Sequence, residues 1–277
     1  KDRDSANAIA VDSEGCAYIT GSTESRDFPI TRSYDKSYNG EQDAFVVKLN
    51  PEGTKLEYAT FLGGKDRDSA NAIAVDSEGC AYVAGSTYSK DFPMTETVGG
   101  RIAPGYKKEF IGGIEPVVFN GQVLSYDECD DAFIVKISTN GTSLEYASFL
   151  SGDGYDSIED IAIDESRSLY LAGGTSSEDF TMTETVGGKR IPGYDKEYQG
   201  GFLVKLNKYG TSLQYSTFLS CRPRAIDIDD EECVYLTGYT GPNLPMTITV
   251  GGREAPGYDK EYHGGDRKDA WTGEIIG

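Results

Sequence analysis

The sequence predicts an all-β protein built from four consecutive units, each a four-stranded antiparallel sheet. Three observations carry this prediction: one pattern occurs four times, its segments have the composition of strands, and no stretch keeps the 3.6-residue period of an amphipathic helix. The copies of the pattern run over 7–23, 71–87, 160–175 and 225–240. The second copy differs from the first only at Val83 and Ala84. Such self-similarity is typical of a repeat protein, so we expect the units to stack on one another.

The first strand of each unit is predicted at the start of the repeated pattern, which in the first unit includes Ala8-Ile9-Ala10-Val11. Both faces of this stretch are apolar, with alanine on one side and Ile9 and Val11 on the other. A strand that is apolar on both faces is expected to be buried on both. We therefore predict burial near a central axis for eight equivalent side chains. They are Ile9, Val11, Ile73, Val75, Ile161, Ile163, Ile226 and Ile228.

The other three strands of a unit follow from similar runs rich in Val, Tyr, Phe and Thr. In the first unit they are expected at about 16–21, after a Ser-Glu-Gly turn, at 43–49, and at 56–62 after a second glycine turn. The outermost run keeps a polar residue, Glu57, as expected for a strand nearer to solvent. The third strand recurs at 131–137, 200–206 and, more loosely, 269–275, whereas the fourth recurs only at 144–150 and 213–219.

Four-stranded sheets that repeat along a chain, with the innermost strand the most apolar, describe the blades of a β-propeller. The predicted blades span about 1–64, 65–152, 153–220 and 221–277, and the last is incomplete. Both ends of the sequence resemble cuts through a longer array, because Lys1 to Asp12 duplicates Lys65 to Asp76. We therefore expect these blades to form an arc of a ring with six to eight blades.

The repeats also resemble a known family. The run Ala-Ile-Ala-Val-Asp-Ser-Glu-Gly-x-Ala-Tyr-x-x-Gly-Ser-Thr, followed by Asp-Phe-Pro, Asp-Ala-Phe-Val-Val-Lys-Leu-Asn and Tyr-Ala-Thr-Phe-Leu-Gly-Gly, is similar to the SBBP repeat of seven-bladed β-propellers. The core of the run also resembles the NHL repeat. Where many SBBP repeats have asparagine, this chain has Cys16, Cys80 and Cys233. The resemblance implies a secreted or surface protein of bacteria or archaea, and it implies no catalytic motif.

Composition narrows the classes of partner. The chain has 26 Lys and Arg residues against 46 Asp and Glu residues, for a formal net charge of −20. Such a surface argues against nucleic acid, which binds clusters of basic side chains. The cysteines number five, an odd count, which does not suit a disulfide framework. Cys16, Cys80 and Cys233 are expected to be buried thiols, whereas Cys129 and Cys221 could form a pair.

One class of loop varies in length while the scaffold stays constant. The interval from Phe28 to Asp43 is 15 residues, and the matching interval from Phe92 to Asp131 is 39. Because loops alternate between the two ends of an antiparallel sheet, these loops share an end with the connections between blades. Variable loops on a rigid scaffold are where binding usually occurs. The candidate ligand-binding residues are therefore the tyrosines that recur in these loops: Tyr106, Tyr194, Tyr198, Tyr258 and Tyr262. Anchoring of each loop to its own blade explains the same tyrosines.

Sequence motifs for catalysis are absent. The single histidine, His263, cannot build a multi-histidine metal site, and no nucleophile elbow or phosphate-binding loop occurs. No cofactor is expected apart from Ca²⁺, for which Asp4, Asp68 and Asp156 at the blade connections are the candidate ligands. Turn capping by these aspartates explains their recurrence equally well.

The sequence therefore favours a non-enzymatic propeller module of a secreted or cell-surface protein, which acts in protein or ligand interaction or as a structural scaffold. Its partner is expected to be a protein or a glycan on the end that carries the variable loops, with no nucleic acid and no membrane insertion in this segment. Two alternatives stay open. One is a carbohydrate-active hydrolase or lyase that uses carboxylates at the same end. The other is an intracellular scaffold like the NHL proteins, which free cysteines would suit.

Overall fold

The computed structural model describes most of the repeated scaffold and part of the loops. The described residues are 2–95, 97–98, 101–102, 110–112, 114–119, 122–180, 182, 185–186, 189–190, 200–210, 212–240, 249–250, 253–254, 267–268 and 275–276. They contain strands, turns and bends but no helix, so the predicted all-β class is confirmed for them. Correspondingly, this part of the chain has no helix that could cross a membrane.

Three complete antiparallel sheets and the start of a fourth form the scaffold. Blade 1 contains β1 (Asp4–Val11), β2 (Ala17–Thr23), β3 (Asp43–Leu49) and β4 (Leu56–Leu62). Blade 2 contains β5 (Asp68–Val75), β6 (Ala81–Thr87), β11 (Asp131–Ile137) and β12 (Leu144–Phe149). Blade 3 contains β13 (Asp156–Ile163), β14 (Leu169–Thr175), β17 (Gly201–Leu206) and β18 (Leu213–Leu219). Blade 4 contains β19 (Cys221–Ile228) and β20 (Val234–Thr240). Its expected third strand at 269–275 falls almost entirely outside the described residues.

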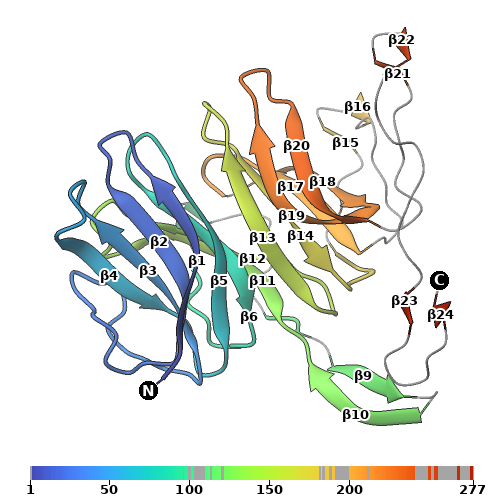
Figure 1. Ribbon diagram of the computed structural model, residues 1–277, viewed down its shortest axis with the longest axis horizontal. Helices are drawn as coiled ribbons and strands as arrows, with labels where there is room; N and C mark the ends of the chain where they lie inside the picture. Colours follow the sequence, from blue (N-terminus) through green and yellow to red (C-terminus); the bar gives the residue numbers. More distant parts are fainter. Residues whose placement is uncertain are drawn as a thin grey trace.

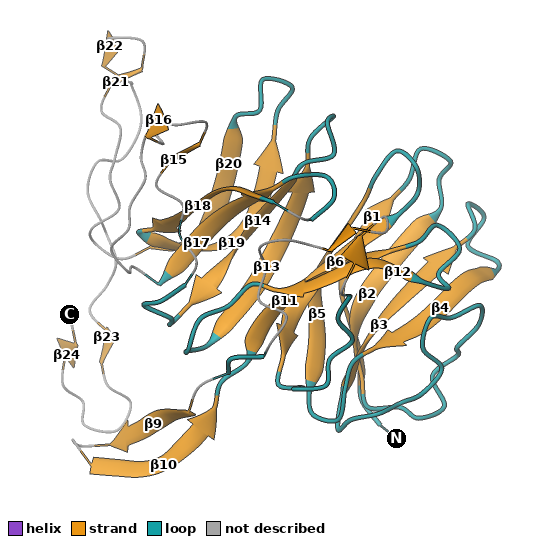
Figure 2. Cartoon of the chain, turned by 180° about the vertical axis from the view of Figure 1, so that it is seen from behind, coloured by secondary structure: helices purple, strands orange, loops and turns teal. Residues whose placement is uncertain are grey.

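The blades stand side by side as an open arc (Figure 1). Their first strands, β1, β5, β13 and β19, are neighbours in chain order, as expected for the innermost strands of a propeller. Within the described residues, no strand pairing joins blade 1 to blade 4. Figure 2 shows the same open arrangement from behind. The arc is therefore confirmed, and closure into a larger ring stays a prediction.

Most of the core lies between the blades rather than within any one of them. We call the face that a blade turns toward the next blade its trailing face, and the opposite one its leading face. The trailing face of blade 1 presents Cys16, Tyr18, Val46, Tyr58 and Leu62. The leading face of blade 2 presents Ile73, Val83, Phe133, Val135 and Phe149. Blades 2 and 3, and then 3 and 4, join in the same way. Each blade thus obtains its core from a neighbour.

Side chains of the first strand are buried only where a neighbouring blade covers them, and two of the eight burial predictions are wrong. Ile73, Ile161 and Ile226 are only 6 %, 6 % and 7 % exposed, and the residues two positions after each of them are half-buried. Ile9 and Val11, in contrast, are 64 % and 61 % exposed. Their side chains lie on the leading face of blade 1, against which no described strand packs. The apolar pattern predicts a face that can pack against another blade. Its side chains are buried only where such a blade is present.

A β-bulge in every first strand links consecutive blades. The ladder between the first two strands slips at Asn7, Asn71, Glu159 and Arg224, which are equivalent positions. A bulged residue leaves the ladder and can point elsewhere. The Asn71 amide donates to Ser157 Oγ and to the carbonyl of Ile158, both at 3.1 Å. At the junction of blades 3 and 4, an ion pair between Arg224 and Glu159 replaces this amide contact.

A buried triad of Asp, Tyr and Lys explains the motif around the Ser-Glu-Gly turn. In blade 2, Asp76 accepts hydrogen bonds from the Cys80 backbone N–H and from the Tyr82 hydroxyl, both at 3.0 Å. Lys136 Nζ lies 3.3 Å from the same carboxylate. Burial raises the pKa of Asp76, but these hydrogen bonds and the lysine outweigh it, and the pKa is lowered. Blades 1 and 3 repeat the ion pair with Asp12–Lys48 and Asp164–Lys205.

The long loop of blade 2 contains an extra hairpin. Its strands are β9 (Ile114–Phe119) and β10 (Gln122–Glu128), and Figure 1 shows them projecting beyond the sheets. Each variable loop of blades 2 to 4 also forms a two-residue ladder around its Gly-Gly pair, a structure that the sequence reasoning missed. The ladders join β7 (Thr97–Val98) to β8 (Arg101–Ile102), β15 (Thr185–Val186) to β16 (Lys189–Arg190), and β21 (Thr249–Val250) to β22 (Arg253–Glu254). A last ladder joins β23 (Arg267–Lys268) to β24 (Ile275–Ile276).

None of the five cysteines forms a disulfide. Cys16 and Cys80 are buried, as predicted, because their trailing faces are covered. Cys233 is exposed, so its predicted burial is wrong, and no described strand covers the trailing face of blade 4. Cys221 lies in β19, and it is not bonded to Cys129.

Candidate functional site

The second strands end, and the first strands begin, at the same end of the arc. We call this end the loop face; it comprises the variable loops at 24–42, 88–130 and 176–200 and the connections at 63–67 and 151–155. The opposite end carries the short turns at 12–16, 50–55 and 76–80, and we call it the turn face. The long loops and the short turns therefore lie at opposite ends of the blades, as the sequence predicts.

The five candidate ligand-binding tyrosines lie outside the described residues. They are Tyr106, Tyr194, Tyr198, Tyr258 and Tyr262. A related loop tyrosine, Tyr38 of the first unit, does lie within the described residues. Its ring packs edge-on against Phe61 with centroids 5.9 Å apart, and Arg26 lies over it. In this copy, the tyrosine anchors its loop to the outer strand of the blade.

Asp4 and Asp68 use both carboxylate oxygens for hydrogen bonds within the protein, whereas Asp156 uses only Oδ2, and its buried Oδ1 has no hydrogen-bond partner among the described residues. Asp68 accepts hydrogen bonds from the Gly64 N–H at 2.7 Å, from Ser89 Oγ at 2.9 Å, and from the Thr87 hydroxyl. Asp156 accepts from the N–H of Gly152 at 2.7 Å and from Ser177 Oγ at 2.8 Å. Asp4 likewise accepts from Thr23 and Ser25. Each aspartate thereby ties the start of its first strand to the end of the second.

Metal binding by these aspartates stays a prediction. Within the described residues, no three His, Cys, Asp or Glu side chains gather as a metal site would require. The observed contacts match the turn-capping explanation, in which short side chains satisfy nearby backbone groups.

Two of these aspartates should make the stability of the protein depend on pH. Burial raises the pKa of Asp68 and of Asp156 to about 7, although their hydrogen bonds oppose the shift. The unfolded pKa is 3.8, so the stability that each contributes is complete below that pH and is lost as the pH rises through 7. We expect the free energy of unfolding to fall between pH 5 and pH 8, by about 2 kcal/mol for each carboxyl. Urea unfolding at pH 5 and at pH 8 measures this fall in the free energy of unfolding.

The variant Asp68→Asn is the matched test of that pH dependence. An amide cannot ionise, so the fall in stability between pH 5 and pH 8 should be smaller in this variant than in the unchanged chain. An equal fall in both proteins would show that Asp68 does not titrate in this range.

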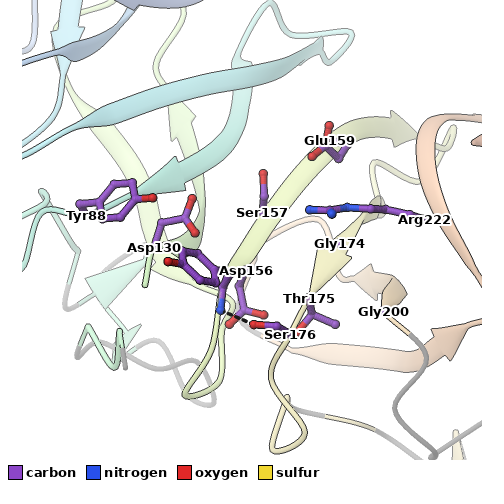
Figure 3. Close-up of a pocket in the computed structure, with 11 residues that line it drawn as sticks. Tyr88, Asp130, Asp156, Ser157, Glu159, Gly174, Thr175, Ser176, Gly200 and Arg222 are labelled. Atoms are coloured by element: carbon purple, nitrogen blue, oxygen red, sulfur yellow. Dashed lines mark hydrogen bonds between the residues drawn. The ribbon is translucent and has the colours of Figure 1, made fainter. Parts of the chain in front are cut away.

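A pocket opens on the loop face at the junction of blades 2, 3 and 4. Its volume is about 530 Å³, within the range of sites for small ligands. Figure 3 shows the side chains that line it. They are Tyr88, Asp130, Tyr155, Asp156, Ser157, Glu159, Gly174, Thr175, Ser176, Gly200 and Arg222.

The pocket forms where the later blades depart from the repeat. Gly200 replaces the aspartate that blades 1 and 2 have at Asp43 and Asp131, and Cys221 replaces the next aspartate, the equivalent of Asp156. The junction of blades 3 and 4 therefore lacks both of the carboxylates that the earlier junctions have. Four further positions change in the same region. Compared with blade 2, Tyr155 replaces Arg67, Glu159 replaces Asn71, Gly174 replaces Ser86, and Arg222 replaces Ser69.

The charged groups of the pocket differ in how far they are already engaged. Glu159 is paired with Arg224, and Asp156 is held by its hydrogen bonds. Burial raises the pKa of Asp130, and a hydrogen bond from Ser86 opposes the shift. Burial, with Asp130 nearby, raises the pKa of Tyr88 to about 12, so its hydroxyl stays protonated. The pocket therefore offers hydroxyl donors and one accessible carboxyl.

A second hollow, of about 400 Å³, lies on the turn face between blades 3 and 4. Its lining includes Asp164 and Asp229, which already accept backbone hydrogen bonds in their turns. This hollow is therefore a product of the scaffold motif, and the loop-face pocket is the better candidate.

The sequence analysis singled out the end of the blades at which this pocket lies and one residue that lines it, Asp156. It missed Tyr88, Asp130, Tyr155 and Arg222. For Tyr155 and Arg222 a signal existed, since both replace the residue that the repeat has at that position. Aligning the units with one another, and not only with a family pattern, would have revealed them.

Comparison with known families agrees with the fold. The family model SBBP, described as a beta-propeller repeat, matches residues 2–29 and 57–93. These ranges cover the first strands of blades 1 and 2 and the outermost strand of blade 1. No curated protein sequence matches the chain.

Proposed function

Because this chain carries SBBP beta-propeller repeats, we propose that it is a non-enzymatic binding module of a secreted or cell-surface protein. The ligand is a glycan, and it binds on the loop face in the pocket between blades 2, 3 and 4. One observation carries the proposal: residues that depart from the repeat at Tyr155, Gly174, Gly200 and Arg222 all line this pocket. Changes needed only for stacking would have no reason to gather in one hollow.

The scaffold suits this role. Blades joined by buried faces give a rigid support, and binding residues on the ends of such a support keep their positions without an ordering cost. The pocket combines two tyrosines, Tyr88 and Tyr155, with serine and threonine hydroxyls. Aromatic rings pack against the C–H faces of sugars, and hydroxyl and carboxyl groups bind their hydroxyls. A glycan therefore fits the lining better than an apolar ligand.

The state of the carboxylates supports binding rather than hydrolysis. A glycosidase needs two carboxyl groups flanking the reacting bond. In this pocket Glu159 is paired with Arg224, and Asp156 accepts a hydrogen bond from the serine that follows its second strand, as Asp4 and Asp68 do in the other blades. Asp130 is then the one carboxyl in the lining without a scaffold role of this kind. One carboxyl suffices to bind a sugar hydroxyl.

The proposed location rests on the resemblance of the repeats to those of secreted and surface proteins. The net charge of −20 supports it, since a strongly acidic surface keeps an exposed protein soluble. The intracellular alternative rests on the cysteines, none of which forms a disulfide. Three of them, Cys16, Cys80 and Cys129, are buried, where they are protected from oxidation in any compartment.

A glycan array tests the proposal. The unchanged chain should bind a subset of immobilised glycans, and the variant Tyr155→Arg/Arg222→Ser should lose that binding. These substitutions restore the residues of blade 2 and leave the net charge unchanged. The matched control, Tyr209→Arg/Arg167→Ser, makes the same two substitutions on the turn face and should bind normally. Equal binding by all three proteins would refute the loop-face pocket, and no binding to any glycan would refute the glycan ligand.

A further inference from the structure

One guanidinium in the pocket is free to bind an anion. Among the described residues, Arg222 has no carboxylate within ion-pair distance, whereas Arg224, two positions later, is paired with Glu159. A side chain that projects into a hollow and lacks a protein partner is available to a ligand. Arginine presents a planar fork of donors that matches a carboxylate in a bidentate manner.

The backbone around Arg222 is adapted to hold this side chain. A Cβ atom on Gly174 would lie 2.5 Å from Arg222 Nε and 3.0 Å from Nη2. The first two blades have serine there, at Ser22 and Ser86. The glycine and the arginine thus depart from the repeat together, and the glycine makes the space that the guanidinium fills.

The opposite wall of the pocket has different chemistry. Figure 3 shows the Arg222 guanidinium and the Asp130 carboxyl directed toward each other from opposite sides, with Ser157 between them and Tyr88 beside Asp130. The charge of Arg222 lowers the pKa of Asp130, which burial raises, so the two groups interact across the space. A ligand that spans the pocket therefore needs a negative group at one end and hydrogen-bond donors at the other.

We propose that the pocket binds a carboxylated sugar of the uronic acid class. The carboxylate of the sugar binds Arg222, and its ring hydroxyls bind Asp130, Ser157 and Ser176. This inference rests on the proposed function and adds the class of glycan. A neutral sugar would leave the guanidinium unpaired when water is displaced, which weakens binding. An anion without hydroxyl groups would give Asp130 no hydrogen bond beyond the one that Ser86 already donates.

Calorimetric titration with D-glucuronate and D-glucose tests the inference, because these sugars differ only at C6, where glucuronate has a carboxylate and glucose has a hydroxymethyl group. The unchanged chain should bind glucuronate at least about tenfold more tightly than glucose. Arg222→Gln should abolish this preference while leaving the weak binding of glucose. Gly174→Ser should also reduce it, since the new side chain displaces the guanidinium without changing the charge. Arg167→Gln, which removes an arginine on the turn face, should keep the preference.

Each alternative result has a distinct meaning. Equal affinity for the two sugars, or a preference that survives Arg222→Gln, would overturn the inference about uronic acids. The proposed glycan-binding function would still stand if the array glycans bind and Tyr155→Arg/Arg222→Ser abolishes that binding. A preference lost equally in Arg167→Gln would show a general effect of charge and would also overturn the inference.

Discussion

Replacing Ile73 with alanine should lower the free energy of unfolding by about 2–5 kcal/mol, while replacing Ile9 should change it by less than about 0.5 kcal/mol. The two residues occupy the same position in neighbouring repeats, but Ile73 is 6 % exposed and Ile9 is 64 % exposed. Ile73 packs against the trailing face of blade 1, so its removal leaves a cavity between the blades. Ile9 has no blade against it, and its removal takes away a side chain that is already in water.

Chemical denaturation of both variants, at several protein concentrations, measures this difference. The comparison is well matched because both variants carry the same substitution, at equivalent positions of two first strands that have the same flanking residues. A cost for Ile9→Ala equal to that of Ile73→Ala would show that another blade covers Ile9 in solution. In that case the chain would close or assemble, and the open arc would be wrong.

Replacing Lys136 with methionine should lower the free energy of unfolding by about 3–5 kcal/mol. The Asp76 side chain is fully buried, and Lys136 lies 3.3 Å from it, beneath Tyr82 and beside Glu145. Methionine fills a similar space but leaves the carboxylate without its cation. An uncompensated buried charge is among the largest single sources of instability.

The control for this variant is Lys55→Met, which removes a lysine from an exposed ion pair with Glu57. Surface pairs of this kind contribute little, so its cost should be below about 1 kcal/mol. Thermal or urea unfolding of the two variants gives the comparison. Equal costs would show that the triad of Asp76, Tyr82 and Lys136 does not stabilise the blade.

Strand positions and the division into faces could be predicted from the sequence because they follow from local pattern. Alternation within runs such as Asp43–Leu49 specifies two faces, and the repeat specifies that the faces recur. Burial could not be predicted in the same way. Ile9 and Ile73 have identical local sequences, and what separates them is the presence of a neighbouring blade.

The pocket could be predicted only in part, for a related reason. Its position on the loop face follows from loop length, but its lining comes from β13, β14 and β19 and from loop residues beside the strands of blades 2 and 3, which meet only in the folded arc. The Gly-Gly hairpins were a different omission. Two glycines between short strand-forming runs are a local hairpin signal, and the pattern Thr-Val-Gly-Gly was present in the sequence three times.

The most direct test of the account is to map binding on the protein during titration with D-glucuronate. Backbone amide shifts of ¹⁵N-labelled protein report where the ligand lies. We predict saturable changes at Ser157, Thr175 and Ser176 in the pocket and none at the turns 13–15 and 77–79 on the turn face. Changes confined to those turns, or no saturable change at the pocket while another site responds, would contradict the account.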